Sequence, residues 1–254
     1  MEVLKLGVIL TLSIIGVFVV FGFLIELLNK VSKKKIYEAF GKPVLFLTCC
    51  IGTPVHEFGH YIMCKIFLHK VVEVKWFIPS AVETGGVLGY VKHSRKNTIY
   101  QRIGDFFIGI GPLIVGSIII AVLFKNLLPS TCEALLNMEG LKINEVFKII
   151  FSIANLKNYK FWIFIILSIS ISSHMSLSKM DIKNSYFGAI ILLVINLIIA
   201  FNIVNFNINI DRVFKFIYNY NLICISFMSI GVLTIILTII ISTIFYGLRK
   251  AVRI

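Results

Sequence analysis

Long apolar stretches separated by short polar segments dominate the chain. Six of them stand out, and they cover residues 6–28, 44–68, 103–125, 160–178, 185–203 and 222–247. An α-helix needs about 20 apolar residues to cross a bilayer, and each stretch is close to that length. The pattern predicts an all-α polytopic membrane protein with about six transmembrane helices. The first stretch is too long for the core of a signal peptide and lacks a following small-residue cleavage site, so we expect it to be a retained span.

The polar segment between the second and third stretches has a different pattern. Within residues 69–102, β-branched residues at 71–78 are followed by Gly85-Gly86-Val87-Leu88-Gly89-Tyr90-Val91. Glycines among strand-forming residues predict a bulged β-hairpin near residues 70–93. An exposed hairpin edge can pair with an extended peptide. We therefore expect this segment to bind substrate, through Gly85, Gly86, Val87 and Leu88.

Two other segments lie between the predicted spans. Residues 133–158 carry apolar positions at helical spacing with lysines between them. This spacing predicts an amphipathic helix that lies at the membrane interface. Residues 204–220 are rich in Asn and aromatic residues, and we predict a short loop outside the membrane there.

The composition agrees with a membrane location. Of the 254 residues, 58% are hydrophobic and 15% are charged, whereas about 45–50% apolar residues is usual in a globular domain. The formal net charge of +13 is interpreted as Lys and Arg that flank the membrane. No base-reading motif accompanies this charge, so nucleic acid is excluded as a partner. We expect one membrane-embedded domain, residues 1–254, in an integral multi-pass protein of the cell membrane, with the lipid bilayer as its surroundings.

One motif in the second apolar stretch carries chemistry. His56-Glu57-Phe58-Gly59-His60 has the HExxH pattern of zinc proteases. Residues four apart share one helix face, so the two imidazoles can bind one Zn²⁺ while Glu57 reaches a water molecule on it. Gly59 permits close approach beside the metal. Ionisable groups are costly in hydrocarbon and mark functional sites, so the setting indicates chemistry inside the bilayer.

A catalytic zinc site needs a third protein ligand, and the motif does not supply it. The metzincin extension is absent, because Met63 and Ile66 occupy the positions where it requires Gly and His. Asp105 begins a predicted span and is interpreted as a helix N-cap. Other candidates downstream of the motif are Glu73, Glu83, His69, His93, His174, Asp181 and Asp211. We interpret His69 and His93 as polar residues at the membrane interface.

The motifs together resemble the site-2 protease family of intramembrane zinc metalloproteases. Besides the HExxH helix, Gly85–Val91 resembles the family's Gly-Gly-Tyr-Val hairpin and Gly109–Leu113 resembles its Gly-Pro-Leu segment. Met175–Asp181 occupies the place of the downstream motif whose Asp is the third ligand. The resemblance covers residues 44–190, with accessory helices at 6–28 and 185–247.

The resemblance implies a function and a ligand set. The implied activity is hydrolysis of peptide bonds in membrane-spanning or membrane-associated proteins, with one Zn²⁺ per chain. His56, His60 and Asp181 would bind the metal and Glu57 would be the general base. The chain departs from the family around Asp181, where the family has Asn and Pro before the aspartate and Gly after it. His174 therefore remains the rival third ligand.

Two other classes of function are open at this stage. One is a catalytically inactive relative that only binds membrane proteins, and the intact Glu57 argues against it. The other is a metal transporter, which needs polar ligands along several spans. The first, fifth and sixth predicted spans carry almost none.

Overall fold

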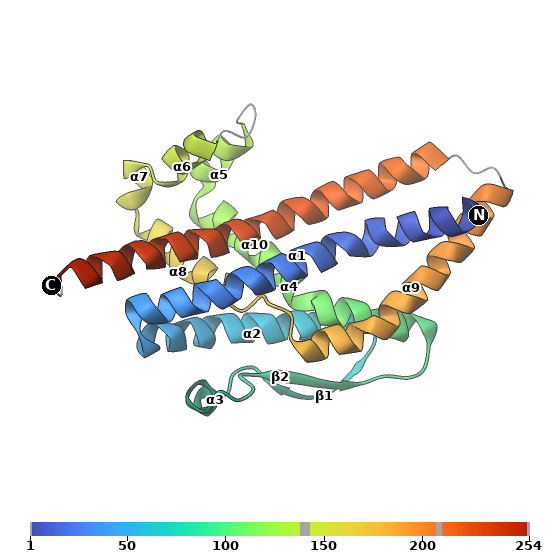
Figure 1. The fold of residues 1–254 in the computed structure, drawn as a ribbon, viewed down its shortest axis with the longest axis horizontal. Helices are drawn as coiled ribbons and strands as arrows, with labels where there is room; N and C mark the ends of the chain where they lie inside the picture. Colours follow the sequence, from blue (N-terminus) through green and yellow to red (C-terminus); the bar gives the residue numbers. More distant parts are fainter. Residues whose placement is uncertain (1, 138–142, 207–209, 253–254) are drawn as a thin grey trace.

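The computed structural model describes residues 2–137, 143–206 and 210–252 (Figure 1). Over these residues the fold is helical with one small sheet, which confirms the predicted all-α class and the hairpin. The elements in chain order are α1 (Glu2–Phe40), α2 (Lys42–Ile66), β1 (Lys70–Lys75), α3 (Pro79–Thr84), β2 (Tyr90–Ser94), α4 (Ile99–Leu127), α5 (Pro129–Leu136), α6 (Ile143–Ile150), α7 (Ile153–Leu156), α8 (Tyr159–Ser172), α9 (Lys179–Asn205) and α10 (Ile210–Val252).

Four helices in the described ranges are long and apolar enough to cross a membrane, namely α1, α4, α9 and α10. The predicted number of six spans is not shown. Helix α8 has 14 residues, or about 21 Å of helix, against a hydrocarbon core of about 30 Å. Helix α2 is continuous over 25 residues, but it carries the polar residues of the HExxH motif.

The two outer helices extend well beyond the predicted spans. Helix α1 has 39 residues and α10 has 43, so they are about 58 and 65 Å long. They lie side by side and run in the same direction (Figure 1). The loop predicted at 204–220 is wrong for the described residues, because α9 continues to Asn205 and α10 begins at Ile210. Residues 207–209 lie outside the described part. Ile217 is buried in a cluster with residues of α1 and α9. This packing stabilises the helical conformation of an Asn-rich segment.

The segment predicted as one interfacial helix at 133–158 is divided. It contains the end of α5 and the short helices α6 and α7, and residues 138–142 lie outside the described part. Asn155 is buried here, and its side-chain amide donates hydrogen bonds to the Thr131 hydroxyl and to the carbonyl groups of Ile149 and Ile150. These contacts fix α5 and α6 relative to α7.

The hairpin spans the predicted region, but the glycine-rich residues 85–89 connect its strands instead of belonging to them. Strands β1 and β2 pair antiparallel, with Val71 opposite His93 and a bulge between Val71 and Glu73. Helix α3 lies between the strands in the chain, and Gly85 ends it with a positive φ of 71°. Lys92 and Tyr90 donate hydrogen bonds to the Glu73 carboxylate, and these bonds lower the pKa of Glu73.

Helix α4 lies at the centre of the bundle and packs against α2, α8, α9 and α10. Glycines on both helices allow α4 to approach α2 closely. A Cβ atom added to Gly59 would lie 2.7 Å from the backbone nitrogen of Pro112, and one added to Gly111 would lie 2.6 Å from the Gly59 carbonyl oxygen. We expected Gly59 to permit close approach beside the metal. In the structure Gly59 instead allows the backbone of α4 to pack directly against the HExxH helix.

This contact gives a first prediction. Gly59→Ala forces the α2 and α4 backbones apart, and overpacking of this kind costs about 1–3 kcal/mol. The midpoint of thermal unfolding in detergent is expected to fall. Gly16→Ala on α1 is the matched control, because beyond its own helical turn no atom of the described residues lies within 4 Å of its added Cβ. Alanine is favoured over glycine inside a helix by about 0.5–1 kcal/mol, so the control is expected to hold or raise the midpoint. Equal midpoints for the two variants would contradict this packing.

Candidate metal centre

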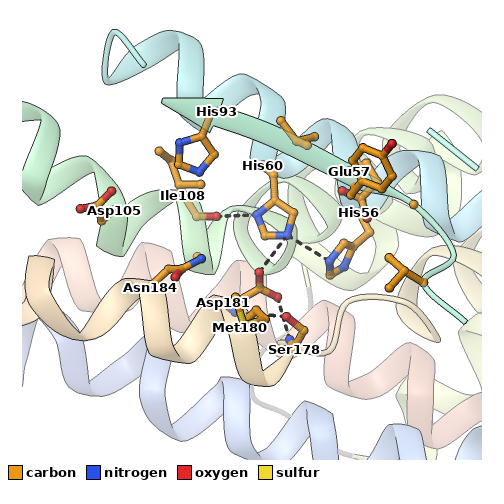
Figure 2. Close-up of a pocket in the computed structure, with 15 residues that line it drawn as sticks. His56, Glu57, His60, His93, Asp105, Ile108, Ser178, Met180, Asp181 and Asn184 are labelled. Atoms are coloured by element: carbon orange, nitrogen blue, oxygen red, sulfur yellow. Dashed lines mark hydrogen bonds and ion pairs between the residues drawn. The ribbon is translucent and has the colours of Figure 1, made fainter. Parts of the chain in front are cut away.

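His56 and His60 lie one turn apart on α2 and point toward the same spot. Their Nε2 atoms are 3.1 Å apart, and the ring centroids are separated by 4.8 Å (Figure 2). His60 is buried and His56 is half-buried. The helical spacing predicted that the two imidazoles share a face, and the structure places them so.

Backbone carbonyl groups fix the orientation of both rings. His56 Nδ1 donates to the carbonyl oxygen of His174 at 2.6 Å, and His60 Nδ1 donates to that of Ile108 at 2.8 Å. A carbonyl oxygen only accepts, so each Nδ1 carries the hydrogen. In a neutral imidazole the other nitrogen then holds a lone pair. The two Nε2 lone pairs consequently face each other with no proton between them, an arrangement that a cation between them would stabilise.

Asp181 completes the group from the first turn of α9. Its Oδ2 accepts from the backbone N–H of Ser178 at 2.7 Å, and the Ser178 hydroxyl accepts from the backbone N–H of Asp181 at 3.1 Å. This reciprocal pair is a capping box. The other carboxylate oxygen, Oδ1, lies 3.4 Å from His60 Nε2. One oxygen thus begins the helix while the other faces the histidines.

The three side chains could hold one metal ion. His56, His60 and Asp181 each offer a ligand atom, and these atoms lie within 4.8 Å of one another. Zinc binds nitrogen and carboxylate oxygen at about 2.0–2.2 Å, so two ligand atoms on one tetrahedral ion are about 3.4 Å apart. The separations of 3.1 and 3.4 Å at His60 Nε2 are close to this value.

The route by which Asp181 reaches the site differs from the prediction. The predicted span at 160–178 would place Asp181 just past the end of that helix, but α8 ends at Ser172 and Asp181 lies in the first turn of the next helix, α9. Ser170 and Ser173 donate back to the carbonyls of Ile166 and Ile169 at the end of α8. Ser178 then caps α9, so a single helix does not continue through this segment.

The rival ligand His174 lies beside the site in a different role. Its ring Nδ1 is 3.1 Å from the Ser170 carbonyl oxygen, and the ring packs against Gly52. It is not one of the three described residues whose ligand atoms converge. What His174 does contribute is its backbone carbonyl, which holds His56.

Asp105 and His69, two further candidates, have partners of their own. Asp105 is not the N-cap of α4, because Thr98 caps that helix by accepting from the Gln101 N–H, and Asp105 forms an ion pair with Arg95 at 2.8 Å. His69 is 3% exposed, so it is buried rather than placed at a polar surface. Its Nδ1 lies 2.9 Å from Nδ1 of His93.

A cavity of about 420 Å³ opens next to the three converging residues, between α2, β2, α4 and α9. Glu57 lines it and is 5% exposed (Figure 2). Gly89 lies against Glu57, since an added Cβ would be 2.9 Å from its Cγ. Of the four residues expected to bind substrate, Val87 lines the cavity, while Gly85, Gly86 and Leu88 are not among its lining residues.

Comparisons with models of known protein families, with characterised proteins and with solved structures give no match. The site therefore has to be interpreted from its own geometry.

Several supporting groups were not found from the sequence. The carbonyl groups of Ile108 and His174 carry no side-chain signature, so no sequence pattern could have revealed them. Ser178 is different, because Ser-x-x-Asp before an apolar run is close to the sequence signature of a capping box. That signal would have placed Asp181 at a helix start.

The capping box gives a second prediction. Ser178→Ala removes the acceptor for the Asp181 N–H, and loss of a serine N-cap costs about 1 kcal/mol. Thermal unfolding in detergent is expected at lower temperature, with Ser178→Thr close to wild type because threonine also caps. Ser176→Ala in the same linker serves as the control. The assignment fails if Ser178→Ala and Ser176→Ala unfold at the same temperature.

Proposed function

We propose that this protein is a zinc-dependent intramembrane peptidase of the site-2 protease type. It hydrolyses peptide bonds of membrane-spanning or membrane-associated proteins and works in the cell membrane. The observation that carries the proposal is the convergence of two imidazole lone pairs and one carboxylate oxygen in a cavity that Glu57 also lines. The four long apolar helices support a membrane setting.

The donor set favours zinc. Two neutral imidazole nitrogens with one carboxylate oxygen are a usual ligand set of catalytic zinc, which keeps a fourth position open for water. The carbonyl groups of His174 and Ile108 accept the outer N–H of each imidazole, as the outer partners of zinc-bound histidines usually do. Bound zinc would supply Lewis-acid chemistry, activating a water molecule and polarising the scissile carbonyl.

Glu57 is the general base in this proposal. It follows His56 directly on α2 and lines the same cavity. Its carboxylate takes a proton from the attacking water and returns it to the leaving amine. Gly89, the residue before β2, leaves space for Glu57, because a Cβ atom at this position would contact the Cγ of Glu57.

The hairpin supplies the surface for an extended substrate. Tyr90, Val91 and His93 of β2 line the cavity, and Val87 and Gly89 precede them. A substrate helix has to unwind before its peptide bond is accessible, and an unwound segment can pair with an exposed strand edge. In this proposal Gly85, Gly86, Val87 and Leu88 contact the unwound substrate segment as it enters the cavity.

The third prediction concerns the metal. Purified protein is expected to contain about one zinc ion per chain, because two imidazoles and one carboxylate form a single site. Asp181→Asn is expected to weaken zinc binding, since a neutral amide is a poor zinc ligand beside a carboxylate. Elemental analysis and competition with a chelator measure both quantities.

The controls for this prediction separate ligation from a change of charge. Asp211→Asn removes a carboxylate from the exposed first turn of α10 and is expected to keep wild-type zinc content. Wild-type zinc content in a His56→Ala, His60→Ala double variant would exclude the assigned site.

The fourth prediction concerns turnover. Glu57→Gln removes the proton acceptor, and general acid–base catalysis contributes about 10²–10⁴-fold, so the cleavage rate is expected to fall by that factor while zinc remains bound. The measurement uses synthetic Leu- and Ala-rich single-helix peptides in detergent, with products identified by mass spectrometry. Glu83→Gln on the exposed end of α3 is the matched control.

The same variant distinguishes the other classes of function. A binding protein or a metal transporter does not need a general base, so Glu57→Gln would keep peptide binding or zinc uptake into liposomes. Cleavage by Glu57→Gln at the wild-type rate would refute the proposed peptidase mechanism.

A further inference from the structure

The end of the cavity away from Glu57 contains a histidine that the proposed peptidase chemistry does not use. His93 lies on β2 opposite Val71, is half-buried, and lines the cavity. Figure 2 shows its imidazole beside Ile108, with Asp105 and Asn184 bordering the same end.

A chain of hydrogen bonds sets the tautomer of His93. His69 Nε2 is 2.8 Å from the backbone carbonyl oxygen of Gln101. A carbonyl oxygen only accepts, so Nε2 of His69 carries the hydrogen. In neutral His69, Nδ1 therefore holds a lone pair. His93 Nδ1 lies 2.9 Å away and must donate to it. The remaining nitrogen of His93, Nε2, is then a hydrogen-bond acceptor.

The surrounding residues support this protonation state and fix the ring. Burial and the neighbouring His69, His60 and Arg95 lower the pKa of His93 to about 4, so it is neutral at pH 7. His69 is in turn fixed by buried Gln101, whose side-chain amide donates to the Leu68 carbonyl at 2.6 Å. The acceptor on His93 is therefore positioned before any substrate binds.

The charges at this end favour a neutral ligand over an ionised one. Asp105 is paired with Arg95, whose Nε lies 2.8 and 3.1 Å from its two carboxylate oxygens. A substrate cation would find the Asp105 carboxylate already paired with Arg95, and a substrate anion would face both that carboxylate and the lone pair of His93. A neutral group that donates a hydrogen bond meets neither penalty, and the carboxamide of Asn184 can bond to it as well.

We propose that His93 is a specificity-determining residue and that this end of the cavity binds an uncharged, hydrogen-bond-donating side chain of the peptide substrate. The substrate class is thus a membrane segment with a hydroxyl or carboxamide residue near the scissile bond. Such residues are uncommon in apolar spans, so one acceptor can select among many helices. The inference rests on the proposed peptidase function, since it names what that same cavity receives.

The test measures binding without turnover. Zinc-loaded Glu57→Gln protein in detergent is titrated with synthetic Leu- and Ala-rich single-helix peptides that differ only at a central Asn, Ser, Leu, Lys or Asp. A buried hydrogen bond distinguishes the matching ligand by about tenfold, so the Asn and Ser peptides are expected to bind about tenfold more tightly than the Leu peptide. The Lys and Asp peptides are expected to bind no better than Leu.

Variants in the same background identify the residue responsible. His93→Phe removes the acceptor and is expected to abolish the preference. His93→Gln is expected to retain it, because a carboxamide can donate to His69 with its nitrogen and accept with its oxygen. Lys96→Ala in the exposed loop after β2 is expected to leave the preference unchanged. Zinc content and the unfolding temperature are measured for each variant to detect misfolding.

The outcomes separate the inference from the function on which it rests. An undiminished Asn preference in folded His93→Phe would overturn the subsite, as would equal binding of all five peptides to the parent protein. If His93→Phe does not fold, loss of the preference in folded His93→Gln would overturn it too. Cleavage without any preference would reject the subsite and leave the peptidase proposal standing. A preference without cleavage by the Glu57-containing protein would reject the peptidase and support the subsite.

Discussion

Two backbone carbonyl groups determine what the imidazoles of His56 and His60 can do. Because the carbonyls of His174 and Ile108 accept from Nδ1, both Nε2 lone pairs are left pointing at one point between the rings. The two acidic groups of the site lie around this point. The carboxylate of Asp181 arrives at the same point from another helix, and Glu57 lies beside it in the cavity.

The carbonyl of Ile108 can reach His60 only because α4 packs very close to α2. Gly59 and Gly111 provide that closeness, since each has the backbone of the other helix where a Cβ would be. On the opposite side of α4, an added Cβ at Gly109 would meet the Ser185 hydroxyl of α9. Small residues on the central helix thus bring three helices to the distances that the site requires, as is common in membrane helix packing.

Features with a local sequence signature were predictable, and features that depend on tertiary contacts were not. The spacing of His56 and His60 fixes a shared helix face, so that part of the site was accessible from sequence. The extent of α10 was missed because burial of Ile217 against distant helices maintains the helix. The separate stretches at 160–178 and 185–203 anticipated two helices here, but their bounds were wrong. Helix α8 ends at Ser172, and the Ser178 cap starts α9 at Lys179.

The capping box at the start of α9 has a thermodynamic consequence. Asp181 uses one oxygen to initiate the helix and, in the proposed function, the other to bind the ion. A ligand that binds only the folded form of a segment stabilises that form by mass action. The free zinc concentration would therefore set how often the first turn of α9 frays. Starvation for the ion would thereby loosen one wall of the cavity as well as empty it.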